Sequence, residues 1–414
     1  MDEQQNQKIN FTAFLIHALF LALTLNFIDI NTVVPNMLAE LGGTAMHMGI
    51  LSAIMVGGTK FMQLVFAGMI VPLRKKKPAL LVGIYIRVAA LVILALFLND
   101  LGGEAAWKVW AIMLIMTIFS FSGAYANISY TDIMGKVIAP SRRKRLLMVK
   151  QLISSIGVIV SALLVKVILT RLSYPKNYSL LFLFAGLLLL LGTTGFWLIK
   201  EPATIAPAKT KLKEKIKEFS AVLKSDPNFR KYLLLMNTTG VIKTTIPFFI
   251  LFARQNFVVD GSLTGTFLLV QMAGGLLAMI GLNLFSKSSR YRFMVYLYVI
   301  ISAITPITAL LVPAAPRWYA LVFFLGGIGH SIGQVVAPGV LLEISTDDNR
   351  AIYTGLSGAG SIMQVLYPLL AGYMVGLLGF NLVFILTSIF ILVGLYVAKT
   401  IQCSPFIAPV TPKS

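Results

Sequence analysis

Long apolar stretches alternate with short polar ones along most of the chain. A helix needs about twenty mainly apolar residues to cross the hydrocarbon core of a bilayer, which is the typical length of these stretches. The alternating hydrophobicity of a membrane β-barrel is absent from the pattern. The sequence therefore predicts an all-α integral membrane protein with about twelve transmembrane helices. The expected spans are 11–34, 48–71, 79–98, 108–130, 146–169, 178–199, 231–254, 263–285, 293–312, 318–342, 351–376 and 380–399.

The two parts of the chain resemble each other. Three pairs of residues recur in the same order at offsets of 212, 213 and 207 positions: Pro35 and Pro247, Gly68 and Gly281, and Arg143 and Arg350. A near-constant offset is typical of a duplicated six-span unit. We expect an N-terminal six-helix bundle over 1–200, a cytoplasmic linker over 201–230 and a C-terminal six-helix bundle over 231–414.

The expected linker is the longest polar segment of the chain. Its stretch KLKEKIKEFSAVLK places Leu212, Ile216, Phe219 and Leu223 at helical spacing, with lysines between them. This pattern predicts a basic amphipathic helix on the inner leaflet, in contact with anionic lipids. A plain tether between the two bundles is the other interpretation.

Composition and charge agree with a membrane protein. Hydrophobic residues make up 57% of the 414 residues and charged residues 12%, against about 45–50% and about 25% in soluble domains. The formal net charge is +20, and the basic residues gather in alternate loops, such as 74–77, 142–145 and 209–231. By the positive-inside rule, these loops and both termini are cytoplasmic in a multi-pass protein of the bacterial inner or cytoplasmic membrane. The charge is thus explained without nucleic acid as a partner.

Motifs of catalysis are missing from the sequence. It has three histidines, one cysteine, and no P-loop, metal-ligand spacing or nucleophile motif. We therefore expect neither an ATP-driven pump nor an enzyme, and no cofactor or metal site.

The stretch AGMIVPLRKKKPALLVG, which begins at Ala67, is similar to a signature of the major facilitator superfamily in the loop between spans two and three. Gly68 and the basic run from Arg74 match, but Pro72 stands where the family has an aspartate. The stretches APSRRKR after span four and STDDNR after span ten are similar to the family's cytoplasmic hairpins. With twelve spans and a basic central loop, the chain resembles this family over nearly its whole length.

The resemblance implies two bundles around a central cavity that opens alternately to each side, with spans 1, 4, 7 and 10 lining it. Pro72 argues against the family's usual charge latch. The residues that the resemblance assigns to the loop motif and the cytoplasmic gate are Gly68, Arg74, Lys75, Asp132, Arg143, Glu343 and Arg350.

Two lysines are expected at mid-membrane depth, Lys60 in span two and Lys243 in span seven. A charge at the bilayer centre costs at least about 2.5–3.5 kcal/mol, so each ammonium needs a carboxylate, water or an anionic ligand. Asp29 is the one acid placed as deeply, since Asp132 and Glu343 fall near span ends. One acid cannot neutralise two lysines, so we predict a positive cavity that binds an anionic solute. In the alternative, one lysine pairs with Asp29 and the other is hydrated.

Asp29 lies in the stretch NFIDINTVVP, where Asn26, Asp29 and Thr32 recur every three residues and form a polar stripe on one helix face. Two roles are open for this carboxylate. It binds and releases a proton during transport, or it is a fixed counter-ion to Lys60.

Other polar side chains within the spans are further candidates. His330 and Gln334 form an i,i+4 pair in span ten and are candidates for ligand or proton contact. Arg87 is expected to pair with Asp132 or to reach the headgroups, with substrate contact as the alternative. The remaining candidates for hydrogen bonds to a substrate, with helix–helix contact as the alternative, are Asn31, Tyr125, Asn127, Asn237, Thr239, Gln271, Ser361 and Gln364.

The leading hypothesis is a secondary active transporter that moves a small anionic or zwitterionic organic solute by alternating access, coupled to protons and functional as a monomer. The first alternative is efflux of cationic or amphipathic compounds by proton antiport, with Asp29 as the cation partner. The second is a membrane-embedded enzyme that acts on lipids. A net positive cavity favours the first hypothesis, and an isolated acid favours efflux.

Overall fold

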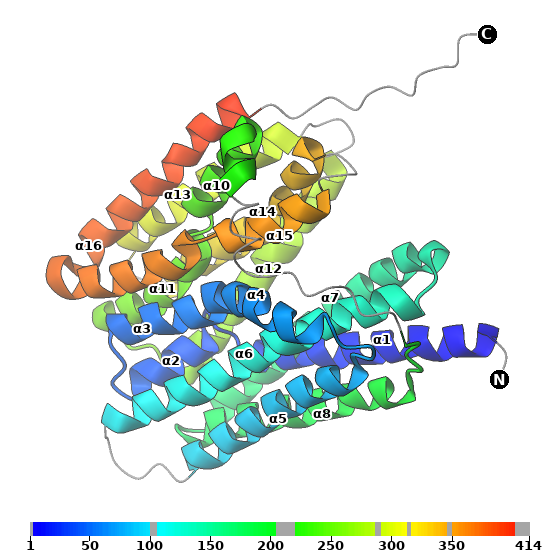
Figure 1. Cartoon of the computed structure of the whole chain (residues 1–414). Coiled ribbons are helices and arrows are strands. Elements are labelled where there is room, and N and C mark those ends of the chain that lie inside the picture. Colours follow the sequence, from blue (N-terminus) through cyan, green and yellow to red (C-terminus); the bar gives the residue numbers. More distant parts are fainter. Residues whose placement is uncertain are drawn as a thin grey trace.

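The computed structural model describes residues 3–99, 106–203, 220–285, 291–312, 316–345 and 350–401. Every regular element in this part of the chain is a helix (Figure 1). The expected amphipathic helix of the linker falls mostly on 204–219, which lie outside the described residues.

The helices pack into two groups. The first consists of α1 (Glu3–Phe27), α2 (Val33–Glu40), α3 (Ala45–Ser52), the π-helix η1 (Ala53–Gly58), α4 (Thr59–Ile70), α5 (Lys77–Asn99), α6 (Ala106–Val137), α7 (Pro140–Arg171) and α8 (Lys176–Leu198). The second consists of α10 (Pro227–Thr239), α11 (Ile242–Asn256), α12 (Gly261–Phe285), α13 (Tyr291–Leu311), α14 (Pro316–Ile344), α15 (Arg350–Gly360) and α16 (Met363–Thr400). We call these groups the first and second halves.

The described residues contain 11 helical stretches that are long and apolar enough to cross a membrane. The last of them, Leu356–Thr400, has 45 residues. A straight helix of that length would extend about 68 Å, more than twice the hydrocarbon core. Gly379, inside α16, has a φ of +76°, a backbone conformation that glycine adopts far more readily than other residues. Figure 1 shows α16 folding back on itself, so it forms two spans. The predicted twelve-helix membrane fold is confirmed.

The halves touch closely on the side away from the chain termini. There α3 crosses α16, and α7 crosses α12. Glycine makes both crossings possible: a Cβ added to Gly49 would lie 2.2 Å from the Pro368 carbonyl oxygen, and one added to Gly261 would lie 2.1 Å from that of Leu169. Towards the side where α1 begins and α16 ends, which we call the terminal side, the halves diverge (Figure 1).

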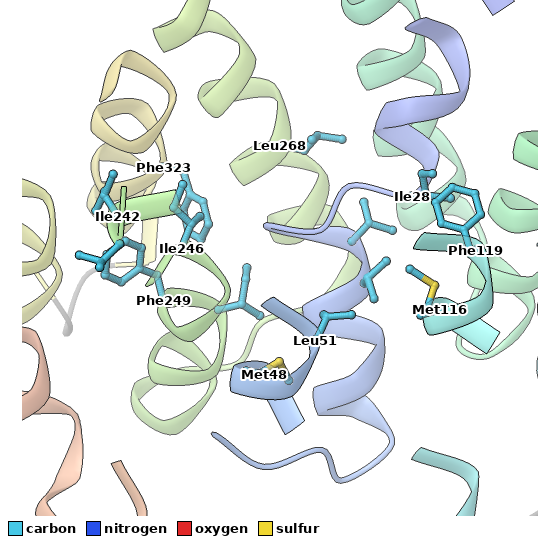
Figure 2. Close-up of a cluster of buried hydrophobic side chains, with 14 of the residues drawn as sticks. Ile28, Met48, Leu51, Met116, Phe119, Ile242, Ile246, Phe249, Leu268 and Phe323 are labelled. Atoms are coloured by element: carbon cyan, nitrogen blue, oxygen red, sulfur yellow. The ribbon is translucent and has the colours of Figure 1, made fainter. Parts of the chain in front are cut away.

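A buried apolar cluster joins the two halves (Figure 2). Its labelled members from the first half include Met48, Leu51 and Met116, and those from the second half include Ile246 and Phe249. All five are almost inaccessible to solvent. In this conformation the side away from the termini is therefore sealed by packing.

Similar contacts cap the C-terminal end of the last helix in each half. The Lys77 ammonium donates to the carbonyl oxygens of Trp197 and Ile199, at 2.6 and 2.9 Å, where α8 ends. Arg292 donates in the same way to the Ala398 carbonyl, at 3.0 Å, and to that of Lys399, where α16 ends. A cation there satisfies carbonyls that the helix leaves free. Lys77 and Arg292 lie at the starts of α5 and α13, the third helix span of each half.

Candidate functional site

A cavity of about 500 Å³ lies between the two halves. Two of its lining side chains, Lys60 and Gln63, come from α4 in the first half. The second half supplies the rest from α10, α11, α13, α14, α15 and α16. The polar lining residues of the second half are Tyr232, Lys243, Tyr298, Thr354, Ser357, Ser361 and Gln364.

Three of the polar lining residues lie in or close to interruptions of helices. Lys60 follows the π-helix η1 by two residues, and Lys243 follows the break at Gly240 and Val241 between α10 and α11. Ser361 lies in the break between α15 and α16. Irregular backbone at membrane depth is tolerated where it lines a water-filled cavity, and π-helical turns are frequent at functional sites. The interruptions therefore mark this cavity as the candidate site.

The two lysines give the cavity a positive potential. The ion pairs of the described residues join Lys76 and Lys136 to acids on the terminal side and Arg254 to Glu40 on the other side. Lys60 and Lys243 take part in none of them, and they are close enough for their charges to repel each other. The lining residues given by the structure include no carboxylate. In a low-dielectric environment two unneutralised cations attract an anion strongly.

One lining side chain has hydrogen-bonding capacity to spare. The side-chain oxygen of Gln364 is buried and has no hydrogen-bond partner within the described part of the chain. A buried acceptor that stays unpaired costs about 1–3 kcal/mol. Because this oxygen is inaccessible to solvent, a molecule in the cavity would reach it only after the side chain moves.

A polar cluster closes the side away from the termini. It consists of Asn36, Glu40, Tyr178 and Arg254, and we call it the outer cluster. Arg254, from the second half, donates to the Asn36 side-chain oxygen at 2.9 Å and lies 3.5 Å from a Glu40 carboxylate oxygen. The Asn36 side-chain nitrogen in turn donates to Glu40 at 2.9 Å and to Tyr178 at 2.7 Å. Burial raises the pKa of Glu40, and Arg254 acts in the opposite direction.

A second charged cluster lies on the terminal side, within the first half. Asp132 pairs with Lys76 at 2.8 Å and with Lys136 at 2.6 Å, and Lys136 also reaches Glu201 at 3.2 Å. The Glu201 carboxylate accepts hydrogen bonds from the backbone N–H groups of Lys76 and Lys77, where α5 begins. A carboxylate there is also favoured by the helix dipole.

The family model of the Major Facilitator Superfamily matches residues 14–312. The chain belongs to the Major Facilitator Superfamily. It is therefore a transporter and not an enzyme, and its apolar helices make it a multi-pass integral membrane protein. The predicted resemblance is confirmed, and the alternative of a lipid-modifying enzyme is excluded.

Solved structures of other transporters share this fold. They include the nucleoside transporter NupG (12% identity, TM-score 0.68, 95% of this chain and 99% of that chain covered). A peptide transporter POT in complex with sulfate has 12% identity and a TM-score of 0.70, with 97% and 99% covered. A bacterial homologue of the human lysosomal transporter Spinster has 13% identity and a TM-score of 0.65, with 94% and 96% covered. At such identities the likeness shows the fold alone. The comparison with curated proteins gives no match.

The lining of this superfamily member differs in part from what the resemblance implied. Spans seven (α10 and α11) and ten (α14) contribute to the lining, as the resemblance implied. Spans two, nine and eleven contribute as well. Among the described lining residues, none comes from α1 and α2, which form span one, or from α6, which forms span four. Four candidates from the sequence lie on the cavity: Lys60, Lys243, Ser361 and Gln364.

Three polar candidates satisfy backbone or helix contacts instead. The Asp29 carboxylate accepts hydrogen bonds from the backbone N–H groups of Asn31 and Thr32, at 3.0 and 2.7 Å, and from the Thr32 hydroxyl, where span one is interrupted. Asn237 joins the Gly360 carbonyl to the Met363 N–H across the break in span eleven. Asn26 donates to α7, at the Val158 carbonyl and the Ser161 hydroxyl.

Of the roles expected for Arg87, the pairing with Asp132 is wrong. The guanidinium group lies 4.3 Å from the centre of the Phe119 ring, a cation–π contact. Asp132 is occupied by Lys76 and Lys136. Asp29 is likewise not paired with Lys60 in the described part of the chain.

The other polar candidates do not appear on the cavity lining. The Thr239 hydroxyl donates to the Leu235 carbonyl, and Tyr125 packs edge-on against Phe66. Gln271 is buried, and its backbone carbonyl faces Gly327 of α14. His330 and Gln334 are 3.3 Å apart, which agrees with their expected pairing. Asn31 is buried beside Asp29, and Asn127 is exposed on α6.

The candidates for the loop motif and the cytoplasmic gate lie in different environments. Gly68, Arg74 and Lys75 are exposed, and only Asp132 joins the terminal-side cluster. Arg143 donates to the Ile138 and Gly135 carbonyls near the end of α6. Glu343 is half-buried at the end of α14, and Arg350 is the first residue of α15, with its side chain outside the described set.

The sequence analysis did not identify some residues of the cavity and of the terminal-side cluster. Gln63 lies three positions after Lys60, and this helical spacing could have identified it. Tyr232 and Tyr298 carry no such signal, because aromatic residues are common throughout the spans. Lys76 and Glu201 were missed because their partners lie far away in the sequence.

Proposed function

We propose that this protein is a secondary active transporter that moves a small organic anion or zwitterion by alternating access, coupled to protons. It acts as a monomer in the bacterial cytoplasmic membrane, with the termini and basic loops in the cytoplasm. The observation that carries the proposal is the pair of unneutralised lysines on one cavity, Lys60 from the first half and Lys243 from the second.

The chemistry of the lining favours an anion. Two ammonium groups at membrane depth are costly without negative charge, and the residues around them are neutral. A carboxylate or phosphate group would accept charge-assisted hydrogen bonds from both lysines. The hydroxyl oxygen of Ser357, which is a lining residue and only partly buried, would accept a hydrogen bond from a hydroxyl or ammonium group of the same molecule. An amino acid or hydroxy acid has this combination of groups.

Efflux of cationic compounds is supported less well. It requires an acid that faces the cavity, and Asp29, the acid considered for it, is absent from the lining given by the structure. One Asp29 oxygen already accepts three hydrogen bonds from Asn31 and Thr32. Two cations on the wall would repel a cationic substrate.

The test begins with purified protein and a thermal-shift screen against a panel of metabolites, because a ligand of the folded form raises its melting temperature. Uptake of the stabilising anion is then measured in proteoliposomes. Lys243→Met should reduce uptake at least about tenfold, because a hydrogen bond to a charged group contributes about 1.5–3 kcal/mol. Lys8→Met, which removes an exposed lysine near the start of α1, is the control and should transport normally. Unchanged uptake by Lys243→Met would remove Lys243 from the site.

A further inference from the structure

The cavity between the halves is lined by two stripes of residues from the second half. Within each stripe the residues repeat every four positions, so they lie on one face of their helix. The stripes are Tyr232, Met236 and Gly240 on α10, and Gly333, Ala337 and Leu341 on α14. The order of residues in a stripe therefore gives their order along the cavity.

The lysines lie at one end of these stripes. Gly240 is three residues before Lys243, and Gly333 is three residues after His330, which interacts electrostatically with Lys243. The other end lies towards the terminal side. There the Lys231 ammonium, near the start of α10, donates to the carbonyl of the last residue of α16, at 2.7 Å. The charged end of the cavity is thus the end that lies deeper in the protein.

Between these ends lies an apolar wall, which consists of Met236, Ala337, Pro338 and Leu341. Pro338 is exposed and Ala337 is partly exposed, whereas Met236 and Leu341 present 8% and 6% of their surface. None of these four side chains can form a strong hydrogen bond. Helix α15 contributes hydroxyl groups to the lining instead. The cavity therefore combines a cationic end with one apolar wall and one hydroxyl-bearing wall.

We propose that the apolar wall binds the side chain of the substrate, and that the protein selects 2-amino or 2-hydroxy acids whose side chain is apolar. This inference rests on the proposed function and names a substrate class within it. Met236 and Ala337 follow the glycines of the lysine end at about 6 Å along each helix, so the side chain of an acid held there reaches the wall. An apolar side chain displaces water from the wall. A polar one would lose its hydrogen bonds to water and find no partner, so it is rejected.

A series of related acids tests the wall. The probes are lactate, 2-hydroxybutanoate, 2-hydroxypentanoate and 2-hydroxyhexanoate, which share a carboxylate and a hydroxyl group and lengthen the side chain by one carbon at each step. Their Kd values for the purified full-length protein are measured by titration calorimetry. We expect the Kd of wild type to fall about three- to fourfold with each added methylene, the effect of moving that group from water to an apolar surface.

Two variants change the wall in different ways. Met236→Gln introduces a polar side chain of similar size and should reduce the gain to less than about twofold per methylene. Ala337→Leu fills space along the wall and should weaken 2-hydroxyhexanoate at least about tenfold, while lactate stays within about twofold of wild type. Met279→Gln and Ala89→Leu, at exposed positions outside the described lining, are the matched controls and should keep the wild-type series.

Equal Kd values for the four acids in wild type would overturn the inference, as would a wild-type series in both Met236→Gln and Ala337→Leu. Detergent takes up the longer acids to the same extent in every sample, so it cannot produce a difference between variants. Failure of the proposed function gives a different result: the neutral 2-hydroxy amides would bind as tightly as the acids, and Lys243→Met would weaken neither. Absence of binding by all four acids would overturn both.

Discussion

At the scale of single residues, polar groups inside the membrane serve two different purposes. Asp29 and Asn237 satisfy backbone groups that become free where spans one and eleven are interrupted. Lys60 and Lys243 lie beside similar interruptions but point their charge at the cavity. Unpaired backbone polar groups are costly in a bilayer, so each interruption needs nearby caps.

Asp29 allows a test of proton coupling that is separate from its capping contacts. Asp29→Asn keeps a side-chain oxygen for the N–H groups of Asn31 and Thr32, so the fold should persist, while the titrating group is lost. If Asp29 carries the coupled proton, the variant should still equilibrate substrate but no longer accumulate it in a pH gradient. Flux with and without the gradient in proteoliposomes measures this.

Asp29→Ala is the matched comparison, because it removes the cap as well. We expect it to lower stability by about 0.5–2 kcal/mol, as the loss of a helix cap does. If Asp29→Asn still accumulates substrate in a pH gradient at the wild-type level, Asp29 has only a capping role, and another group carries the coupled proton.

At the scale of helices, close crossings at glycine hold the two halves together on the side away from the chain termini. The helix α3 approaches α16 where Gly49 faces Pro368 and Gly372 faces the Ala45 carbonyl. Such contacts between small residues are typical of helix pairs in membranes, where association depends on close packing.

Gly49→Ala should disturb this crossing. Its Cβ would lie 2.2 Å from the Pro368 carbonyl oxygen, so α3 and α16 must move apart, at a cost of about 1–3 kcal/mol. Gly376→Ala, on the same helix α16, meets nothing within 4 Å and is the matched control. The thermal unfolding midpoint should fall for Gly49→Ala and stay near wild type for Gly376→Ala. Equal midpoints would mean that the crossing is looser than the structure shows.

At the scale of the whole molecule, the outer cluster links the halves through a titratable group. Burial raises the pKa of Glu40 above its usual value of 4.5, although Arg254 opposes this effect. Glu40 in the outer cluster therefore holds a proton more tightly than an exposed carboxylate would. This contribution to stability is complete below the usual pKa and is lost as the pH rises through the raised value.

Glu40→Gln should reduce the pH dependence of stability. The glutamine side chain does not titrate. The stability of the variant should therefore not fall as the pH rises through the raised pKa of Glu40. The measurement is the unfolding midpoint of both proteins at several values from about pH 4 to pH 8. Asp260→Asn, which alters an exposed acid on the same side, should keep the wild-type profile. Parallel profiles for wild type and Glu40→Gln would contradict the role given to Glu40.

The sequence by itself determined the class of fold, because the length and apolarity of a span are local properties of the chain. It also identified Lys60 and Lys243 as deep charges, since depth follows from position within a span. Only the tertiary structure decided that both lysines face one cavity and that Asp29 does not. It alone showed that Lys76 and Glu201, which are 125 positions apart, meet at the start of α5. Which helix faces approach each other depends on packing between distant spans, and the pattern within any one span does not contain this information.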